Sequence, residues 1–118
     1  MGLFSRFRLP SVSADEAIAM VSEGATLLDV RENNEWNAGH APGAIHIPVG
    51  QVAGQAARRL PKGKTVIVVC RSGARARGAT KSLRDGGMEA LSLSGGMRAW
   101  ESAGGRVVGK GNRPGIIA

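Results

Sequence analysis

A run of β-branched apolar residues that leads into the only cysteine constrains the fold of this 118-residue chain more than any other feature. Val66–Val69 are all apolar and β-branched, and a polar, glycine-containing segment precedes them at residues 62–64. Such a run predicts a strand buried on both faces, because a strand with one wet face alternates between apolar and polar residues. Helices that alternate with strands cover both faces of a sheet, so the run favours an α/β fold.

Cys70 follows this strand directly, and small residues then lead into a predicted helix over residues 74–84. Open α/β sheets bind ligands at the carboxyl ends of their strands, so Cys70 lies where chemistry is expected. Gly73 frees the backbone, so the amides from Arg71 to Ala76 can converge on one point. The positive end of the helix and the nearby guanidinium groups would also stabilise a thiolate. We therefore expect a reactive thiol rather than an inert core cysteine.

The rest of the chain alternates between helix and strand patterns. Ser13 and Glu16 form a capping-box pattern, which predicts a helix that ends at Gly24. Further strands are expected over residues 26–30, 45–47, 88–93 and 107–108, and further helices over residues 33–39, 49–60 and 97–103. This alternation predicts a mostly parallel sheet with helices on both faces. One domain is expected over residues 13–108, with a loosely ordered N-terminal arm at residues 1–12 and a C-terminal tail at residues 109–118.

The net charge of +7 comes from 16 Lys and Arg against 9 Asp and Glu. Nucleic-acid binding is disfavoured, because the basic residues are scattered and only two tryptophans and two phenylalanines could stack on bases. Arg71, Arg75 and Arg77 instead gather around Cys70, which favours a small anionic substrate. One cysteine and two histidines disfavour a structural zinc site. No apolar run reaches the ~20 residues of a membrane span, and residues 1–10 lack the apolar core of a secretory signal, so a cytoplasmic location is expected.

Five short motifs follow one another along the chain. They are Leu27-Leu28-Asp29-Val30-Arg31 with Glu35-Trp36, Gly39-His40-Ala41-Pro42-Gly43-Ala44, Ile47-Pro48, the loop Cys70-Arg71-Ser72-Gly73-Ala74-Arg75, and Gly95-Gly96 followed by Ala99-Trp100. In this order they resemble the rhodanese (thiosulfate sulfurtransferase) domain, over nearly the whole chain from residue 13 to residue 108. Each motif alone is weakly specific, whereas five in register are a strong signal.

The resemblance implies a three-layer fold, with a central parallel five-stranded sheet flanked by helices. It implies a reaction in which Cys70 takes the outer sulfur of thiosulfate or a related donor as a persulfide. A cyanide or thiol acceptor, including a protein thiol, then removes that sulfur. The resemblance implies no metal and no organic cofactor. By carry-over, Cys70 is the nucleophile, Arg75 and secondarily Arg71 bind the sulfonate, and the cradle residues are Arg71, Ser72, Gly73, Ala74, Arg75 and Ala76.

The remaining motif residues are interpreted as structural. We expect Asp29, Arg31 and Glu35 to form a buried or half-buried ion network that braces the loops, and His40 to brace a turn. Trp36 and Trp100 are expected to anchor the core, His46 to be an ordinary strand residue, and Arg77 to face solvent. Ala76 stands where many family members carry Ser or Thr, which removes one hydroxyl contact and predicts weaker tuning of the bound sulfur rather than inactivity.

Two alternatives remain open from the sequence. One is a non-catalytic rhodanese module that binds a protein or senses oxidation; the intact Cys70 and its arginines disfavour this alternative. The other is a cysteine-dependent phosphatase or arsenate reductase, since cell-cycle phosphatases resemble this fold. Their loops carry an arginine six positions after the cysteine, whereas Arg75 is five positions after Cys70, and a tighter ring suits a single sulfur better than a phosphate.

Overall fold

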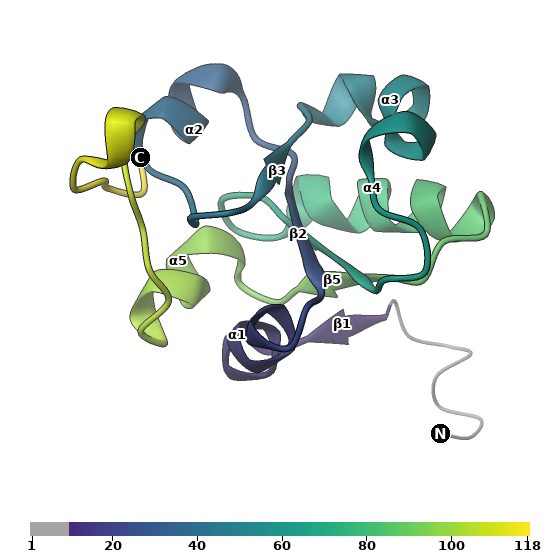
Figure 1. Cartoon of the computed structure of the whole chain (residues 1–118), viewed down its shortest axis with the longest axis horizontal. Helices are drawn as coiled ribbons and strands as arrows, with labels where there is room; N and C mark the ends of the chain where they lie inside the picture. The colour runs from purple at the N-terminus through teal and green to yellow at the C-terminus, as the bar shows by residue number, and fades with distance from the viewer. Residues whose placement is uncertain (1–9) are drawn as a thin grey trace.

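The structure is a computed structural model that describes residues 10–118. In this part of the chain, a five-stranded sheet in the order β1-β5-β4-β2-β3 carries helices on both faces (Figure 1), and every strand pair is parallel. The predicted fold class is therefore confirmed. The strands are β1 (Ser11–Val12), β2 (Thr26–Asp29), β3 (Ile45–His46), β4 (Val66–Val69) and β5 (Ala90–Leu93). The helices are α1 (Ala14–Ser22), α2 (Asn33–Ala38), η2 (Val49–Gln51), α3 (Val52–Arg59), α4 (Ala74–Asp85), α5 (Gly96–Ser102) and η3 (Lys110–Asn112).

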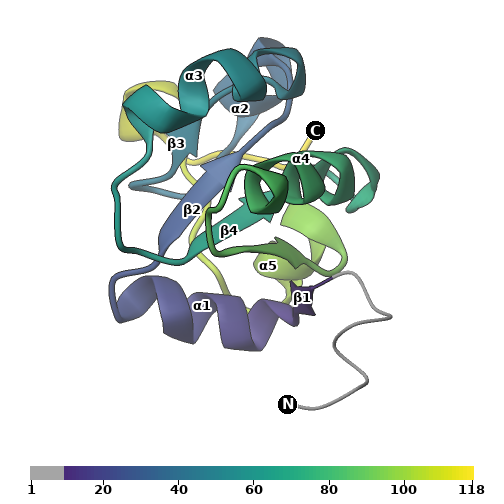
Figure 2. The ribbon, with the colours of Figure 1, turned by 90° about the vertical axis from the view of Figure 1, so that its right-hand side faces the viewer.

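Strand β4 lies in the middle of the sheet and is buried on both faces, as its sequence predicts. Each of its four residues is at most 1% exposed. Val66 and Val68 pack into a cluster with α3 and α4, while Ile67 and Val69 pack into a second cluster with α1 and α5. Figure 2 shows α1 and α5 on one side of the sheet and α3 and α4 on the other. Each fully buried valine or isoleucine contributes about 1.5–3 kcal/mol, so β4 anchors both layers.

The order of the strands creates a divergence point between β2 and β4. The chain leaves β2 toward the edge strand β3, whereas it leaves β4 in the opposite direction, toward β5. The segments that follow β2 and β4 therefore part from each other at the carboxyl edge of the sheet. Open α/β folds bind ligands at such a point. Cys70 follows β4 at this divergence point, and Val30 and Arg31 follow β2.

The structure corrects the expected arm at residues 1–12. Ser11 and Val12 form β1, which pairs with β5 at one edge of the sheet, so they belong to the domain. For Phe4 and Phe7 of this arm, the sequence leaves two interpretations open, docking on the body and contact with a membrane surface. Both residues lie outside the described part of the chain. The capping box of Ser13 and Glu16 is confirmed at the start of α1.

Two further segments differ from the predicted pattern. The helix expected over residues 49–60 begins as a 3-10 turn, η2, before α3. In place of the strand expected at residues 107–108, Val108 forms two isolated bridges, one with His40 and one with Pro114. Beyond Val108, the C-terminal segment turns back to α2, where Ile116 N donates to Ala38 O (2.9 Å). Figure 1 shows this yellow segment beside α2. In residues 10–118, no helix combines the length and the apolar character that crossing a membrane requires.

Candidate functional site

Cys70 is buried at the end of β4 and accepts a hydrogen bond from the loop that follows it. Its side chain belongs to the apolar cluster shared by β4, α3 and α4, and the residue is 1% exposed. The Sγ atom accepts the Gly73 N–H at 3.0 Å. Gly73 has a φ of +122°, a conformation that other residues rarely adopt, so the glycine allows the loop to turn its amide back onto the sulfur. The environment is therefore apolar on one side of the sulfur and polar on the other.

The start of helix α4 adds further amides beside this loop. Gly73 is the N-cap of α4 and provides no side-chain cap. The first intrahelical bond from this end runs from Arg77 N to Gly73 O. Within residues 10–118, the amides of Ala74, Arg75 and Ala76 have no hydrogen-bond partner. Unsatisfied amides at the positive end of a helix are suited to bind an anion, and α4 is twelve residues long.

Helix α5 holds the carbonyl groups of the cysteine loop. Met97 N donates to Cys70 O (2.8 Å), and Arg98 N donates to Arg71 O (3.4 Å). The C=O and N–H of a trans peptide point in opposite directions, so this arrangement turns the amides of Arg71 and Ser72 away from α5. Gly96 permits the close approach, because a Cβ at that position would lie 2.4 Å from Arg71 O. The glycine pair at residues 95–96 thus supports the cysteine loop directly.

A salt bridge between Glu35 and Arg75 connects α2 with the start of α4. Arg75 Nη1 and Nη2 donate to the two Glu35 carboxylate oxygens at 2.7 and 2.9 Å. These hydrogen bonds lower the pKa of Glu35 from 4.5 to about 2, against the opposing effect of burial. The pKa of Arg75 is raised, mainly by its hydrogen bonds to Glu35 and to a smaller degree by the negative charges of Glu35 and Cys70. The guanidinium is thus fixed by a carboxylate beside the cysteine loop.

Asp29 and Arg31 form a second, separate ion pair that is almost completely buried. Asp29 Oδ1 accepts the backbone N–H and the Nε–H of Arg31 (3.0 and 2.9 Å), and Asp29 Oδ2 accepts Nη2–H (2.7 Å). Arg31 Nη2 also donates to Gly39 O (2.6 Å), while its Nη1 has no partner within the described residues. The expected single network that includes Glu35 is therefore two pairs, because Glu35 forms its salt bridge with Arg75.

Three aromatic rings pack beside this pair. The ring of His40 stacks on Trp36 at 3.7 Å between centroids, and the ring of His46 stacks on Trp36 at 4.7 Å. His40 Nδ1–H donates to Trp36 O, and His46 Nε2–H donates to Arg31 O, each at 2.7 Å. Trp36 is half-buried rather than a core anchor, which corrects the prediction for it, whereas Trp100 is 5% exposed in the second cluster. His46 is more than an ordinary strand residue, since it links β3 to the segment after β2.

The other loop residues differ in exposure. Arg71, Ser72, Ala74 and Arg77 are exposed, whereas Gly73 and Ala76 are buried. Arg71 Nε donates to Ala118 O (2.7 Å), which connects the loop to the C-terminal segment. Within residues 10–118, no three His, Cys, Asp or Glu side chains come together in a group that could hold a metal ion.

The structure brings the predicted cysteine loop, Glu35 and Arg75 together at one edge of the sheet. It also adds three contributors that the sequence interpretation missed: Gly96, the Met97 amide and His46. The glycine pair at residues 95–96 was a usable signal for the first two. No local pattern signals the contact of His46, because its partner lies fifteen residues earlier in the chain.

Comparisons with known proteins agree with this geometry. The sequence model of the family described as "Rhodanese-like domain" matches residues 13–103. The Bacillus subtilis protein named "Putative sulfurtransferase YtwF" is 39% identical over 75 residues, which are 64% of this chain and 72% of that protein. Another protein of the same organism, "Putative sulfur carrier protein YrkF", is 34% identical over 79 residues, which are 66% of this chain and 42% of that protein.

Solved structures show the same arrangement of strands and helices. The crystal structure of a rhodanese-related protein from Thermoplasma volcanium aligns with a TM-score of 0.76 at 28% identity. The alignment covers 84% of this chain and 97% of that one. The similarity therefore extends over the complete domain of that protein.

Proposed function

The chain belongs to the rhodanese-like domain family, and from this premise we propose that it transfers a sulfane sulfur through a persulfide on Cys70. A role in sulfur transfer is supported by the family and by relatives named as a sulfurtransferase and a sulfur carrier. The proposed donor is thiosulfate or a related sulfur anion. The proposed acceptor is cyanide or a thiol.

In the first half of the reaction, the Cys70 thiolate attacks the outer sulfur of thiosulfate. A bond forms between Sγ and that sulfur, and the sulfur–sulfur bond of thiosulfate breaks. The electron pair of the broken bond leaves with sulfite, so no external oxidant or reductant is needed. The persulfide keeps one negative charge, next to the Gly73 amide that now contacts Sγ. The unpaired amides at the start of α4 are candidates to hold the outer sulfur.

In the second half, the acceptor attacks the outer sulfur of the persulfide. With cyanide, a carbon–sulfur bond forms, thiocyanate leaves, and the electron pair of the broken bond restores the Cys70 thiolate. The reaction is thereby divided into two displacements at sulfur, each with an anionic leaving group. The same fixed dipoles serve both halves, because the negative charge stays close to Cys70 throughout.

The two arginines proposed for the donor differ in their surroundings. Arg75 donates both of its terminal nitrogens to Glu35, whereas Arg71 is exposed and donates its Nε to Ala118 O (2.7 Å). The terminal nitrogens of Arg71 are therefore the more available donors for the sulfonate end of thiosulfate. Arg75 acts by position and charge, since it joins the loop to α2 beside the thiol.

The observation that carries the proposal is the Gly73 amide directed at the sulfur of the only cysteine. The test is incubation with thiosulfate, followed by intact-protein mass spectrometry and by measurement of thiocyanate after cyanide is added. We expect one extra sulfur atom on the protein and steady release of thiocyanate, with neither in Cys70→Ala. A folded protein that takes up no sulfur from thiosulfate or from polysulfide would refute the proposal and favour a non-catalytic binding module.

A further inference from the structure

Three exposed arginines belong to the cysteine loop and to the two helices that contact it. Arg71 follows the nucleophile, Arg77 lies on α4, and Arg98 lies on α5. The Arg98 backbone amide contacts Arg71 O at 3.4 Å. Arg77 Nη1 reaches back over the loop, since a Cβ at Gly73 would lie 3.5 Å from it. We call these three residues the arginine rim.

Within residues 10–118, no Asp or Glu side chain forms a salt bridge with the rim. The paired bases there are Arg31, Arg75 and Lys81. Arg71 Nε donates to Ala118 O (2.7 Å). Glu101 lies one turn after Arg98 on α5 and forms no ion pair with it. A hollow of about 120 Å³ beside the loop is lined by Gly73, serines and Gly95, and Arg77 is its only charged residue.

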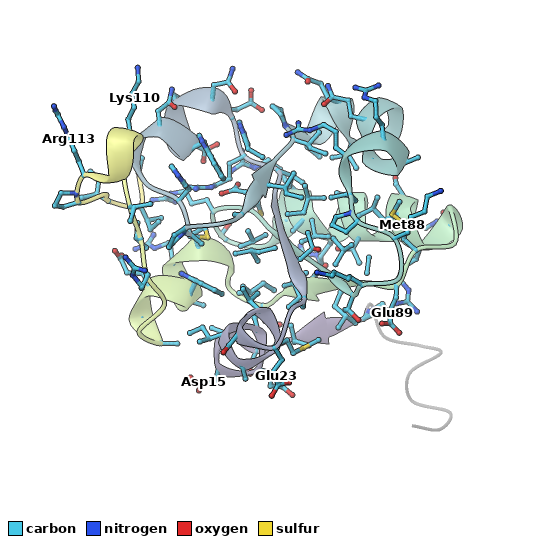
Figure 3. All side chains as sticks on the ribbon, viewed as in Figure 1. Asp15, Glu23, Met88, Glu89, Lys110 and Arg113 are labelled. Carbon is cyan, nitrogen blue, oxygen red and sulfur yellow. The ribbon has the colours of Figure 1, made fainter. Side chains whose placement is uncertain are left out.

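The opposite edge of the sheet has a different charge pattern. There Lys64 and Glu23 line one hollow. Lys62, Lys64 and Glu89 line a second hollow. Figure 3 shows Glu23 and Glu89 apart from the side of the molecule that carries Lys110 and Arg113. The lysines at the amino edge therefore share hollows with carboxylates, whereas the hollow beside the cysteine loop is lined by no carboxylate. The net charge of +7 alone does not explain this difference.

We propose that the arginine rim docks an acidic protein segment that presents a cysteine thiol to Cys70 as the sulfur acceptor. The proposal rests on the proposed sulfur transfer and names the partner of the same site. The rim extends over a loop and two helices, which is wider than a small anion can contact. Cys70 is only 1% exposed, so the accepting group must be narrow. A protruding cysteine flanked by acidic residues meets both requirements, and its opposite charge would steer it to the rim.

The transfer step balances without an added oxidant or reductant. The acceptor thiolate attacks the outer sulfur of the Cys70 persulfide and forms a new sulfur–sulfur bond. The bond between Sγ and the outer sulfur breaks, and its electron pair stays on Cys70 as the thiolate. The acceptor leaves as a persulfide, which retains the negative charge.

The test uses the full chain, loaded with sulfur from thiosulfate, and three short peptides with one central cysteine. The cysteine is flanked by glutamates in the first peptide, by glutamines in the second and by lysines in the third. Each transfer rate is divided by the rate of the same peptide with the neutral disulfide 4,4′-dithiodipyridine, because flanking charge changes the thiolate fraction. At low salt we expect the glutamate peptide to exceed the glutamine peptide by about tenfold in kcat/KM, and the difference to shrink at high salt.

Two double variants with equal charge change identify the surface. Arg77→Glu with Arg98→Glu should abolish the preference for the glutamate peptide, whereas transfer from the sulfur-loaded protein to the glutamine peptide should stay within about twofold of the wild-type rate. Lys62→Glu with Lys64→Glu reverses the same number of charges at the other edge and should keep the preference. Thiocyanate formation also shows that each variant is folded. A wild type that forms no thiocyanate would refute sulfur transfer itself, and this result differs from those that would refute only the docking proposal.

Three results would overturn the docking proposal. One is equal normalised rates for the three peptides at low salt. Another is a preference that survives in the Arg77 and Arg98 variant or disappears in the lysine variant. The third is tighter binding of a labelled single-stranded RNA than of the glutamate peptide, lost in the Arg77 and Arg98 variant, which would assign the rim to nucleic acid.

Discussion

Replacing Glu35 by Gln tests the salt bridge that connects α2 with α4. The substitution keeps the size of the side chain and removes the charge that pairs with Arg75. The lowering of the Glu35 pKa from 4.5 to about 2 corresponds to roughly 3 kcal/mol at 1.36 kcal/mol per unit. The Arg75 side chain is 34% exposed, so solvent screening reduces the expected loss in the free energy of unfolding to about 1–2 kcal/mol at pH 7.

The pH dependence of this effect has a defined sign. The pKa of Glu35 is lower in the folded state, so the unfolded state binds more protons between pH 4.5 and about 2. The stabilisation is complete above the unfolded pKa and is lost as the pH falls through this window. The difference between the wild type and Glu35→Gln should therefore be largest at neutral pH and shrink toward pH 2.

The assay is urea unfolding followed by circular dichroism at a series of pH values from neutral to about 2.5, since urea adds no salt that would screen the pair. Asp85→Asn is the matched control, because its salt bridge with Lys81 joins side chains that are 67% and 70% exposed. That control should lose less than about 0.5 kcal/mol. Stability curves of the wild type and Glu35→Gln that run parallel over the whole pH range would refute the reasoning.

Three other substitutions test the remaining contacts of the site. Gly96→Ala should lower the free energy of unfolding in urea by about 1–3 kcal/mol and slow sulfur uptake, because its Cβ would lie 2.4 Å from Arg71 O. The control Gly78→Ala, with open space around it, should be neutral or stabilising. Equal losses in the two variants would contradict the packing argument. Asp29→Asn should lower the free energy of unfolding by about 3–5 kcal/mol, since it leaves a buried Arg31 without its carboxylate, and a loss below about 1 kcal/mol would show that the pair is dispensable. Arg71→Gln should raise the KM for thiosulfate by about three- to tenfold with little change in kcat, as expected for a lost charge-assisted contact to the donor. An unchanged KM would indicate that Arg75, rather than Arg71, binds the sulfonate.

The sequence alone determined the parts of this protein that depend on local pattern. The apolar run of β4, the glycine-containing loop after it and the helix that begins at Ala74 are adjacent in the chain, so their order predicted a thiol at the foot of a helix. The capping box at Ser13 is likewise local. The short strand β1 escaped prediction because two residues show no period, and its pairing with β5 depends on a segment some eighty positions away.

The tertiary structure decided which charges meet at the site. Glu35 and Arg75 are forty residues apart, and they pair because the sheet order places the segments after β2 and β4 side by side. For the same reason the start of α5 contacts the backbone of Cys70 and Arg71. There Gly96 allows the close approach, and the Met97 amide donates to Cys70 O. Periodicity and propensity describe neighbours along the chain, whereas these contacts exist only once the strands have taken their places in the sheet.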